Sequence, residues 1–193
     1  VARLKEFRQT LDQLYSVNYA AGALVEAEST RCNPLYKASH LTDGDEKTSW
    51  APADDAKNGS FVLDLGKEQH FDVVELKETI EKGQRISAFT IDVAVNGQWV
   101  PYGAGSTVGY RRLIKGQPVD SRYIRVSITD AQATPILNGV SVYKTPASIE
   151  ETDGYPLGLT YHSDRTADRA NGQWNEEGEG IRGTPMRTTS KGA

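Results

Sequence analysis

The sequence predicts a mainly β fold: an antiparallel β-sandwich, preceded by one amphipathic helix and followed by a largely irregular tail. Three observations support this prediction. Between residues 61 and 143, segments rich in β-branched and aromatic residues recur at short intervals, separated by turn residues. No helical period lies between them, which argues against a parallel α/β sheet. The Asn96-Gly97 pair is typical of a two-residue hairpin, because both residues tolerate positive φ.

Apolar residues near the amino-terminal end recur at spacings of three and four: Leu4, Phe7, Leu11 and Leu14. This period predicts an amphipathic helix over residues 2–15, with charged residues on its other face. A helix this short gains most of its stability when its apolar face docks against another element. The pattern leaves open whether that face meets the sheet of this chain or a neighbouring domain.

About seven or eight strands are expected after the helix. A short strand over residues 23–28 comes first, and the turn-rich stretch Leu41 to Trp50 precedes the main series. Strands are then predicted over residues 61–65, 70–77, 86–95, 98–102, 107–114, 122–129 and 136–143. Trp50 and Trp99 each adjoin a strand and hydrophobic neighbours, so we expect both rings in the core.

Composition limits the possible partners of this 193-residue chain. A net charge of −4 without a basic stripe argues against nucleic acid or an anionic membrane as the main partner. We also expect no membrane insertion, because no apolar segment is long enough to span a bilayer. The single cysteine, Cys32, cannot form an internal disulfide.

The carboxyl-terminal stretch, residues 146–193, is rich in Gly, Thr, Glu and Arg and shows no sustained period. We therefore expect an irregular tail, or the start of an absent domain. The chain opens with Val1 rather than Met, as a piece of a longer polypeptide would.

Several short motifs resemble one family of sandwiches when taken in order. They are Leu41-Thr42-Asp43-Gly44, Thr48-Ser49-Trp50, Phe61-Val62-Leu63-Asp64-Leu65-Gly66, Asn96-Gly97-Gln98-Trp99, Arg122-Tyr123-Ile124-Arg125-Val126 and Val140-Ser141-Val142-Tyr143. This series resembles the discoidin, or coagulation factor 5/8 type C, module, which implies a discoidin-like jelly roll over residues 23–145. Bacterial members of that family are largely carbohydrate-binding modules.

A narrower resemblance is carried by Glu78-Thr79-Ile80, Gly83-Gln84-Arg85 and Thr107-Val108-Gly109-Tyr110-Arg111-Arg112. These runs resemble the module that follows the barrel of bacterial α-L-fucosidases of glycoside hydrolase family 29. Residues 1–22 then resemble the last helix of that barrel and its exit. The resemblance implies a retaining, exo-acting glycosidase that is periplasmic or secreted. Its two catalytic carboxyl groups, about 5–5.5 Å apart, would come from the missing N-terminal barrel, so this chain alone should be inactive.

Five residues are candidates for binding sugar or for contacting the barrel: Glu78, Gln84, Arg85, Tyr110 and Arg111. They flank strands in a polar, turn-rich context, where an aromatic face and charged groups suit a pyranose and its hydroxyls. Alternatively, the two arginines pair with Glu78 or Glu81 and hold the module against the barrel. The three histidines, at positions 40, 70 and 162, are isolated, so a catalytic triad or zinc site has little support.

The resemblance also raises the question of a structural calcium ion. In the family, such an ion often sits in the loop that matches Asp43, Asp45 and Thr48, with a further ligand from a Glu just before the last strand. This sequence has Gly139 there, which removes a carboxylate that calcium would use. The alternative is an Asp-capped turn held by its own hydrogen bonds. No cofactor is required in either case.

Two functional hypotheses follow. The chain is either the carboxyl-terminal portion of an α-L-fucosidase, with a sandwich that supports the barrel or its pocket, or a stand-alone discoidin-type module that recognises galactose, fucose or a related sugar. The partner in both cases is a fucosylated or galactosylated glycan. The apolar loop tips through which animal discoidin domains bind proteins or lipids are not matched here, because residues 51–59 and 81–84 are polar.

Overall fold

Six antiparallel strands and one amino-terminal helix make up the part of the chain that the computed structural model describes, residues 2–147. The predicted tail therefore lies almost entirely outside the described residues. The elements in chain order are α1 (Ala2–Leu14), β1 (Leu24–Ala27), η1 (Ala38–Leu41), β2 (Gly59–Glu78), η2 (Ile80–Lys82), β3 (Ile86–Val95), β4 (Gln98–Gly105), β5 (Arg112–Ala131) and β6 (Leu137–Tyr143). Within residues 2–147, no helix has the length and apolar character to cross a membrane.

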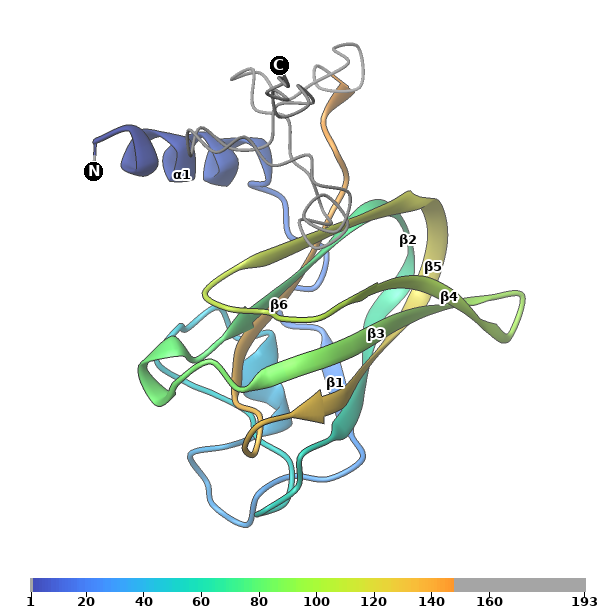
Figure 1. Cartoon of the computed structure of the whole chain (residues 1–193). Coiled ribbons are helices and arrows are strands. Elements are labelled where there is room, and N and C mark those ends of the chain that lie inside the picture. Colours follow the sequence, from blue (N-terminus) through green and yellow to red (C-terminus); the bar gives the residue numbers. More distant parts are fainter. Residues whose placement is uncertain (1, 148–193) are drawn as a thin grey trace, which may run out of the picture. The chain divides into compact units, whose positions relative to one another are not determined.

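The sheet folds over itself into two layers because β2 and β5 are long and bent (Figure 1). Residues 59–64 of β2 pair with β1 and with residues 123–128 of β5, and β3 and β4 continue that layer. Residues 71–78 of β2 pair with residues 112–119 of β5 and with β6, forming the opposite layer. The fold is thus the predicted mainly β, antiparallel sandwich, with every strand pairing antiparallel.

Two pairs of predicted strands are in fact continuous. The predicted strands 61–65 and 70–77 are both parts of β2. The predicted strand 122–129 and the last residues of the predicted strand 107–114 are both parts of β5, which starts at Arg112. Gly66, with φ of 78°, lies where the sequence suggested a break. The pairing shifts register between Asp64 and Gln69 instead of ending, because bulged residues let a strand bend without leaving its sheet.

The β3–β4 hairpin matches its prediction. Asn96 and Gly97 have φ of 51° and 77°, and Val95 pairs directly with Gln98 across this two-residue turn. Trp99, which we expected in the core, lies near the exposed tip of this hairpin instead. Trp99 is 40% exposed on the edge strand β4, where the guanidinium of Arg125 lies 4.7 Å from the ring centroid. The prediction was wrong because Trp99 lies on the outer face of the edge strand β4. Apolar neighbours in the sequence do not reveal which face of a strand a residue occupies.

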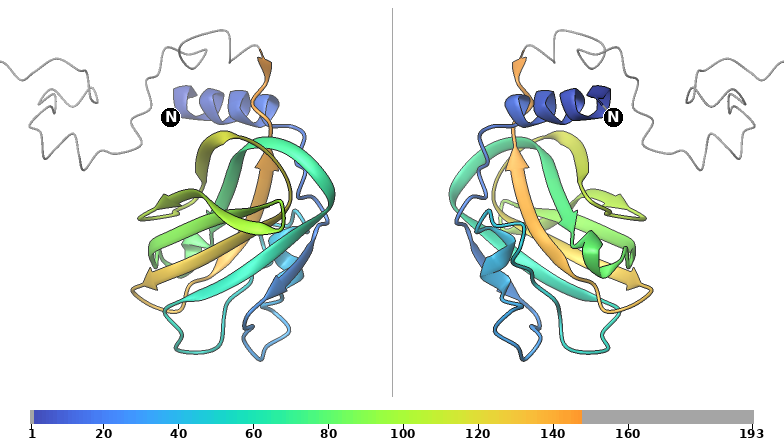
Figure 2. Two further views of the ribbon diagram at one scale, coloured as in Figure 1. Left: turned by 90° about the vertical axis from the view of Figure 1, so that its right-hand side faces the viewer. Right: turned by 90° about the vertical axis from the view of Figure 1, so that its left-hand side faces the viewer.

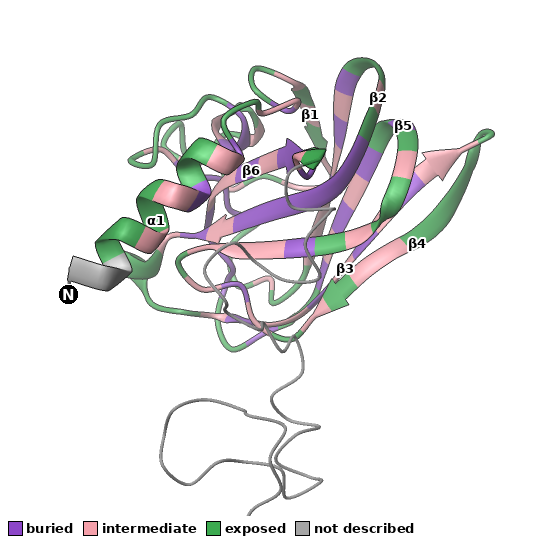
Figure 3. Cartoon of the chain, turned by 90° about the horizontal axis from the view of Figure 1, so that it is seen from above, coloured by how far each residue is buried: buried purple, intermediate pink, exposed green. Residues whose placement is uncertain are grey.

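Side chains from both layers meet in one core between them. In the first part of β2 and along much of β5, buried positions alternate with less buried ones, whereas residues 71–76 of β2 are all buried, seen as an unbroken purple stretch in Figure 3. Trp50, fully buried as predicted, packs edge-on against Phe61 with ring centroids 5.1 Å apart. Its indole nitrogen donates to the carbonyl oxygen of Ser29 at 3.2 Å, and its backbone pairs with Leu137 of β6. The loop that ends at Trp50 is thereby anchored in the core.

Replacing Trp50 should be costly for this reason. We expect Trp50→Ala to lower the free energy of unfolding by about 3–5 kcal/mol, through lost burial and the cavity left behind. Trp99→Ala is the matched control, and it should cost less than about 1 kcal/mol because the ring is already partly solvated. Urea denaturation followed by circular dichroism measures both. Equal losses for the two variants would contradict the burial difference.

The apolar face of α1 docks on the sandwich of the same chain, which answers the question that the periodicity left open. Leu11 and Tyr15 form a buried cluster with Val73 of β2 and Tyr143 of β6, and the two tyrosine ring centroids lie 5.2 Å apart. Phe7 and Leu14 pack at the edge of this cluster. Figure 2 shows α1 lying across one end of the sandwich. Residues 1–146 accordingly form a single structural unit.

Candidate functional site

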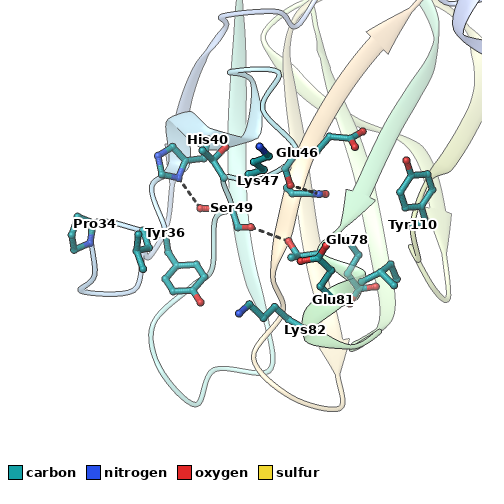
Figure 4. A pocket seen from close by; sticks show the side chains of 15 residues that line it. Pro34, Tyr36, His40, Glu46, Lys47, Ser49, Glu78, Glu81, Lys82 and Tyr110 are labelled. Atoms are coloured by element: carbon teal, nitrogen blue, oxygen red, sulfur yellow. Dashed lines mark hydrogen bonds between the residues drawn. The ribbon is translucent and has the colours of Figure 1, made fainter.

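A hollow of about 750 Å³ lies where the loop after β1 meets the segment that joins β2 to β3. Tyr36 and Tyr110 stand on opposite sides of it in Figure 4, with Glu81 and Lys82 between them. Apolar surface comes from Leu35, Ile80 and Tyr110, which are 68%, 40% and 50% exposed. The remaining lining residues are Pro34, His40, Glu46, Lys47, Thr48, Ser49, Glu78, Thr79 and Asn138. This volume and mixture of aromatic and charged groups suit a polyhydroxylated small ligand.

Side-chain and backbone contacts hold the two walls of the hollow together. The hydroxyl oxygens of Ser49 and Thr79 lie 2.9 Å apart, which joins the loop after β1 to the segment after β2 (Figure 4). Tyr36 forms a parallel bridge with Ser49, so the aromatic ring of this wall is attached to the same anchor. The two walls of the hollow are therefore tied to each other through Ser49.

Glu78, predicted as a binding residue, is almost fully buried at 1% exposure. One carboxylate oxygen accepts hydrogen bonds from the backbone N–H groups of Arg85 at 2.6 Å and Ile86 at 3.0 Å. The other accepts from the N–H of Gly109 at 3.2 Å. The carboxylate thus holds two chain segments in place beside the hollow.

The side chain of Arg85 also bonds within the protein. Its guanidinium donates to the carbonyl oxygen of Thr134 at 2.8 Å and twice to that of Lys82, at 2.8 and 3.1 Å. The two bonds to Lys82 cap the end of η2, where carbonyl groups lack helical partners, and the bond to Thr134 ties this segment to the loop between β5 and β6. Gln84 is exposed, and neither Gln84 nor Arg85 is among the residues that line the hollow.

Arg111 joins α1 to the sheet. Its Nη1 donates to Asp12 of α1 at 2.6 Å, and its Nε donates to Glu75 of β2, which is 1% exposed. Burial opposes the charged guanidinium, but the two carboxylates outweigh it and raise the pKa of Arg111. The structure pairs this arginine with Glu75 rather than with Glu78 or Glu81. The sequence did not single out Glu75, because it lies between Val74 and Leu76 in an ordinary strand pattern.

Tyr110 lies where α1 and the hollow meet. The guanidinium of Arg8 in α1 is 5.0 Å from its ring centroid, and the same tyrosine lines the hollow. Glu78 and Tyr110 are the two members of the predicted set that the hollow contains. Residues that sequence analysis missed include Tyr36 and Lys82; the Asn33-Pro34 turn beside an aromatic residue was the available signal for Tyr36.

The acidic loop folds over its own backbone. Asp43 accepts hydrogen bonds from the N–H of Asp45 at 2.9 Å and from the hydroxyl of Thr48 at 2.8 Å, through different carboxylate oxygens. Asp45 accepts from the N–H of Lys47 at 2.9 Å. These are the contacts of an Asp-capped turn.

Two of the three histidines lie in the described part of the chain. Nδ1 of His40 is 2.9 Å from the carbonyl oxygen of Ser49, and His70 pairs with Asp120 at 2.9 Å. His162 lies outside the described residues. Across residues 2–147, no group of three or more His, Cys, Asp or Glu residues is arranged to hold a metal ion.

Comparison with known proteins extends these observations. The sequence over residues 25–141 matches the model of the F5/8 type C domain. The crystal structure of SpGH29 is 44% identical, with a TM-score of 0.66 over 75% of this chain and 32% of that chain. The Ruminococcus gnavus GH29 fucosidase, solved in complex with fucose, is 30% identical, with a TM-score of 0.66 over 75% of this chain and 30% of its own.

Curated relatives agree with the solved structures. Alpha-L-fucosidase 1 of Arabidopsis thaliana is 28% identical over 146 residues, which cover 72% of this chain and 29% of the relative. The chain thus spans about 29% of the length of the curated relatives it matches. These matches agree with the resemblance read from the motifs, and the domain model covers more than half of the sequence. The chain therefore belongs to the F5/8 type C domain family.

Proposed function

We propose that this chain is the carboxyl-terminal accessory portion of an exo-acting, retaining α-L-fucosidase. The observation that carries the proposal is the extent of the similarity. The match to the Arabidopsis thaliana fucosidase runs over 146 residues, which is longer than the domain matched at residues 25–141. The helix α1, which precedes that domain, is packed against it as one unit. A stand-alone sugar-binding module has less support, because it explains neither the length of the match to the fucosidase nor the packing of α1 against the domain.

The joint between α1 and the sandwich indicates what the accessory portion does. Apolar contacts of Leu11 and Tyr15 and the ionic contacts of Arg111 fix the direction of the helix relative to the sheet. A catalytic barrel that ends in α1 would therefore be held in one orientation to the sandwich rather than on a flexible linker. The two catalytic carboxylates would come from that barrel, so the accessory part supports catalysis by position.

We assign sugar binding to the hollow. The half-exposed ring of Tyr110 offers a face for the apolar side of a pyranose, and Glu81, Lys82 and Lys47 offer charged groups to its hydroxyls. A terminal fucose or galactose of a glycan is the ligand class proposed. The glycosidase relatives favour an exported protein, periplasmic or secreted, and the solved neighbours from Ruminococcus gnavus and Bacteroides thetaiotaomicron favour a bacterial source.

The activity proposal is tested with the complete polypeptide to which this sequence belongs. It should hydrolyse p-nitrophenyl α-L-fucopyranoside with retention of configuration, whereas residues 1–193 alone should release no nitrophenol. Retention follows from two carboxyl groups about 5–5.5 Å apart, one of which forms a covalent intermediate. Cleavage of β-galactoside but not α-fucoside by the complete polypeptide would overturn the assignment, as would fucoside cleavage by the isolated chain.

The binding proposal predicts a specific loss. Tyr110→Ala should weaken binding of L-fucose or D-galactose about 5- to 10-fold, because stacking against an aromatic ring contributes about 1 kcal/mol. Saturation-transfer difference NMR with the 193-residue chain measures this. Two controls separate the causes: Trp99→Ala removes an exposed ring away from the hollow, and Arg8→Ala removes the α1 partner of Tyr110. If Arg8→Ala reproduces the loss, the tyrosine acts through α1 and the stacking role is refuted.

A further inference from the structure

Lys77 occupies a position where the loop 41–50 meets the strands. Its ammonium nitrogen lies 2.7 Å from a carboxylate oxygen of Glu46 in the loop and 3.9 Å from one of Glu75 in the same strand. The lysine side chain is 22% exposed, whereas that of Glu46 is 53% exposed, so water reaches the contact from the Glu46 side. Asn138 of β6 adds a second tie, because its side-chain N–H donates to the carbonyl oxygen of Glu46 at 3.0 Å. Glu46 is therefore held by both β2 and β6.

The contact is the end of a continuous row of alternating charges. Arg111 bridges Asp12 of α1 to Glu75, and Lys77 bridges Glu75 to Glu46. The row extends from the helix across the outer side of β2 to the loop that borders the hollow. Burial opposes the charge of Lys77, but the hydrogen bond to Glu46 and the charges of Glu75 and Glu46 outweigh it, so the pKa of Lys77 is raised.

The residues around this loop do not fit the calcium ion that the family resemblance implies. By the family resemblance, Gly139 stands where a Glu would be expected, and it pairs with Lys77 in the sheet. A Cβ atom added to Gly139 would lie 3.5 Å from Cδ of Lys77, so the lysine stem already covers that position. Both carboxylate oxygens of Asp43 accept hydrogen bonds within the loop. An ammonium group beside the loop also repels a divalent cation.

One feature of this region could attract a cation or a water molecule. The side-chain oxygen of Asn138 is buried and has no hydrogen-bond partner in the described part of the chain. It borders a small cavity of about 50 Å³ that Glu46 and Lys77 also line. A single neutral oxygen does not replace the six to eight oxygen ligands that calcium takes, and the positive charge in the cavity is already supplied by lysine.

We infer that the ammonium group of Lys77 takes the place of a divalent cation, closing the loop 41–50 onto β2 and β6, so that this module keeps its fold without calcium. The inference is independent of the fucosidase proposal, since it concerns how the loop is held rather than what the hollow binds. It also accounts for Gly139 in place of an acidic residue. A carboxylate together with a calcium ion carries a net charge of about +1, and the ammonium group of Lys77 supplies the same charge.

The first experiment tests whether calcium binds to the folded chain. The melting temperature of the 193-residue chain should change by less than about 1 °C between 5 mM EDTA and 5 mM CaCl₂, because a ligand that does not bind the native state does not shift unfolding. Calorimetric titration with CaCl₂ should show no saturable heat. A saturable rise of several degrees with CaCl₂ would overturn the inference.

The second experiment tests whether the charge of Lys77 stabilises the fold. Lys77→Met should lower the melting temperature by about 5 °C, because Glu46 loses its counter-charge and the buried carboxylate of Glu75 keeps only Arg111. Lys47→Met, on the same loop but with an exposed side chain, should change it by less than about 1 °C. In the double variant Lys77→Met/Glu46→Gln the loss should be smaller than the sum of the single losses, since the uncompensated carboxylate is gone. Equal effects of the two lysine variants, or strict additivity, would contradict the charge role.

Discussion

Glu78→Ala should lower the free energy of unfolding by about 3–4 kcal/mol, because the backbone N–H groups of Arg85, Ile86 and Gly109 lose their shared acceptor. A buried donor left without a partner costs about 1–3 kcal/mol, and Glu78 is 1% exposed. Urea unfolding monitored by circular dichroism measures the change. The variant bears directly on function, since Glu78 is one of the two predicted binding residues that border the hollow.

Two further variants make this result decisive. Glu81→Ala removes an exposed carboxylate from the same hollow and should change stability by less than about 0.5 kcal/mol. Glu78→Gln keeps the shape and part of the acceptor capacity, so it should cost less than Glu78→Ala and still fold. If Glu78→Gln keeps full stability but abolishes fucose binding, the carboxylate contacts ligand and the positioning role assigned above is wrong.

Arg111→Met should also be a severe substitution, lowering the free energy of unfolding by about 3 kcal/mol. It leaves the buried carboxylate of Glu75 without its guanidinium partner, and breaking one side of a buried ion pair costs about 3–5 kcal/mol. It also releases Asp12, so the helix α1 loses its ionic contact with the sheet. Hydrogen exchange should accordingly show lower protection of the α1 amides.

Burial, rather than the number of contacts, decides the size of this effect. Arg122→Met is the matched control: Arg122 makes two hydrogen bonds to Asp64, but its side chain is 44% exposed. An exposed pair contributes about 0–1 kcal/mol. The double variant Arg111→Met/Glu75→Met should regain much of the loss, because replacing a whole buried pair by apolar residues is close to neutral. A loss for Arg122→Met equal to that for Arg111→Met would refute the argument.

Much of the architecture could be predicted because it depends on local patterns. The period of the helix, the alternation of the strands and the Asn96-Gly97 turn each reflect backbone geometry that a few neighbouring residues decide. The breaks within β2 and β5 were predicted where none exist, because a glycine such as Gly66 signals a turn equally well whether the strand ends or bends. The exposure of Trp99 was missed for a related reason: sequence does not reveal which side of an edge strand faces water.

The site was harder to predict than the fold. Glu78 and Tyr110 were singled out and do border the hollow, yet the contacts of Glu78 hold backbone in place. Glu75 and Lys77 were not noticed, although they hold the charged row that links α1 to the loop. Their partners, Arg111 and Glu46, are each about 30 or more residues away in the chain, and no local pattern records such a pairing.

By itself, the sequence determined the class of fold, the family and the amphipathic character of α1, because all three follow from residue types at short spacings. The tertiary structure decided where the apolar face of α1 docks, which carboxylates are buried and which cation faces the loop 41–50. These depend on side chains from distant segments meeting in a low-dielectric environment, where burial decides whether a charge stabilises or destabilises the fold.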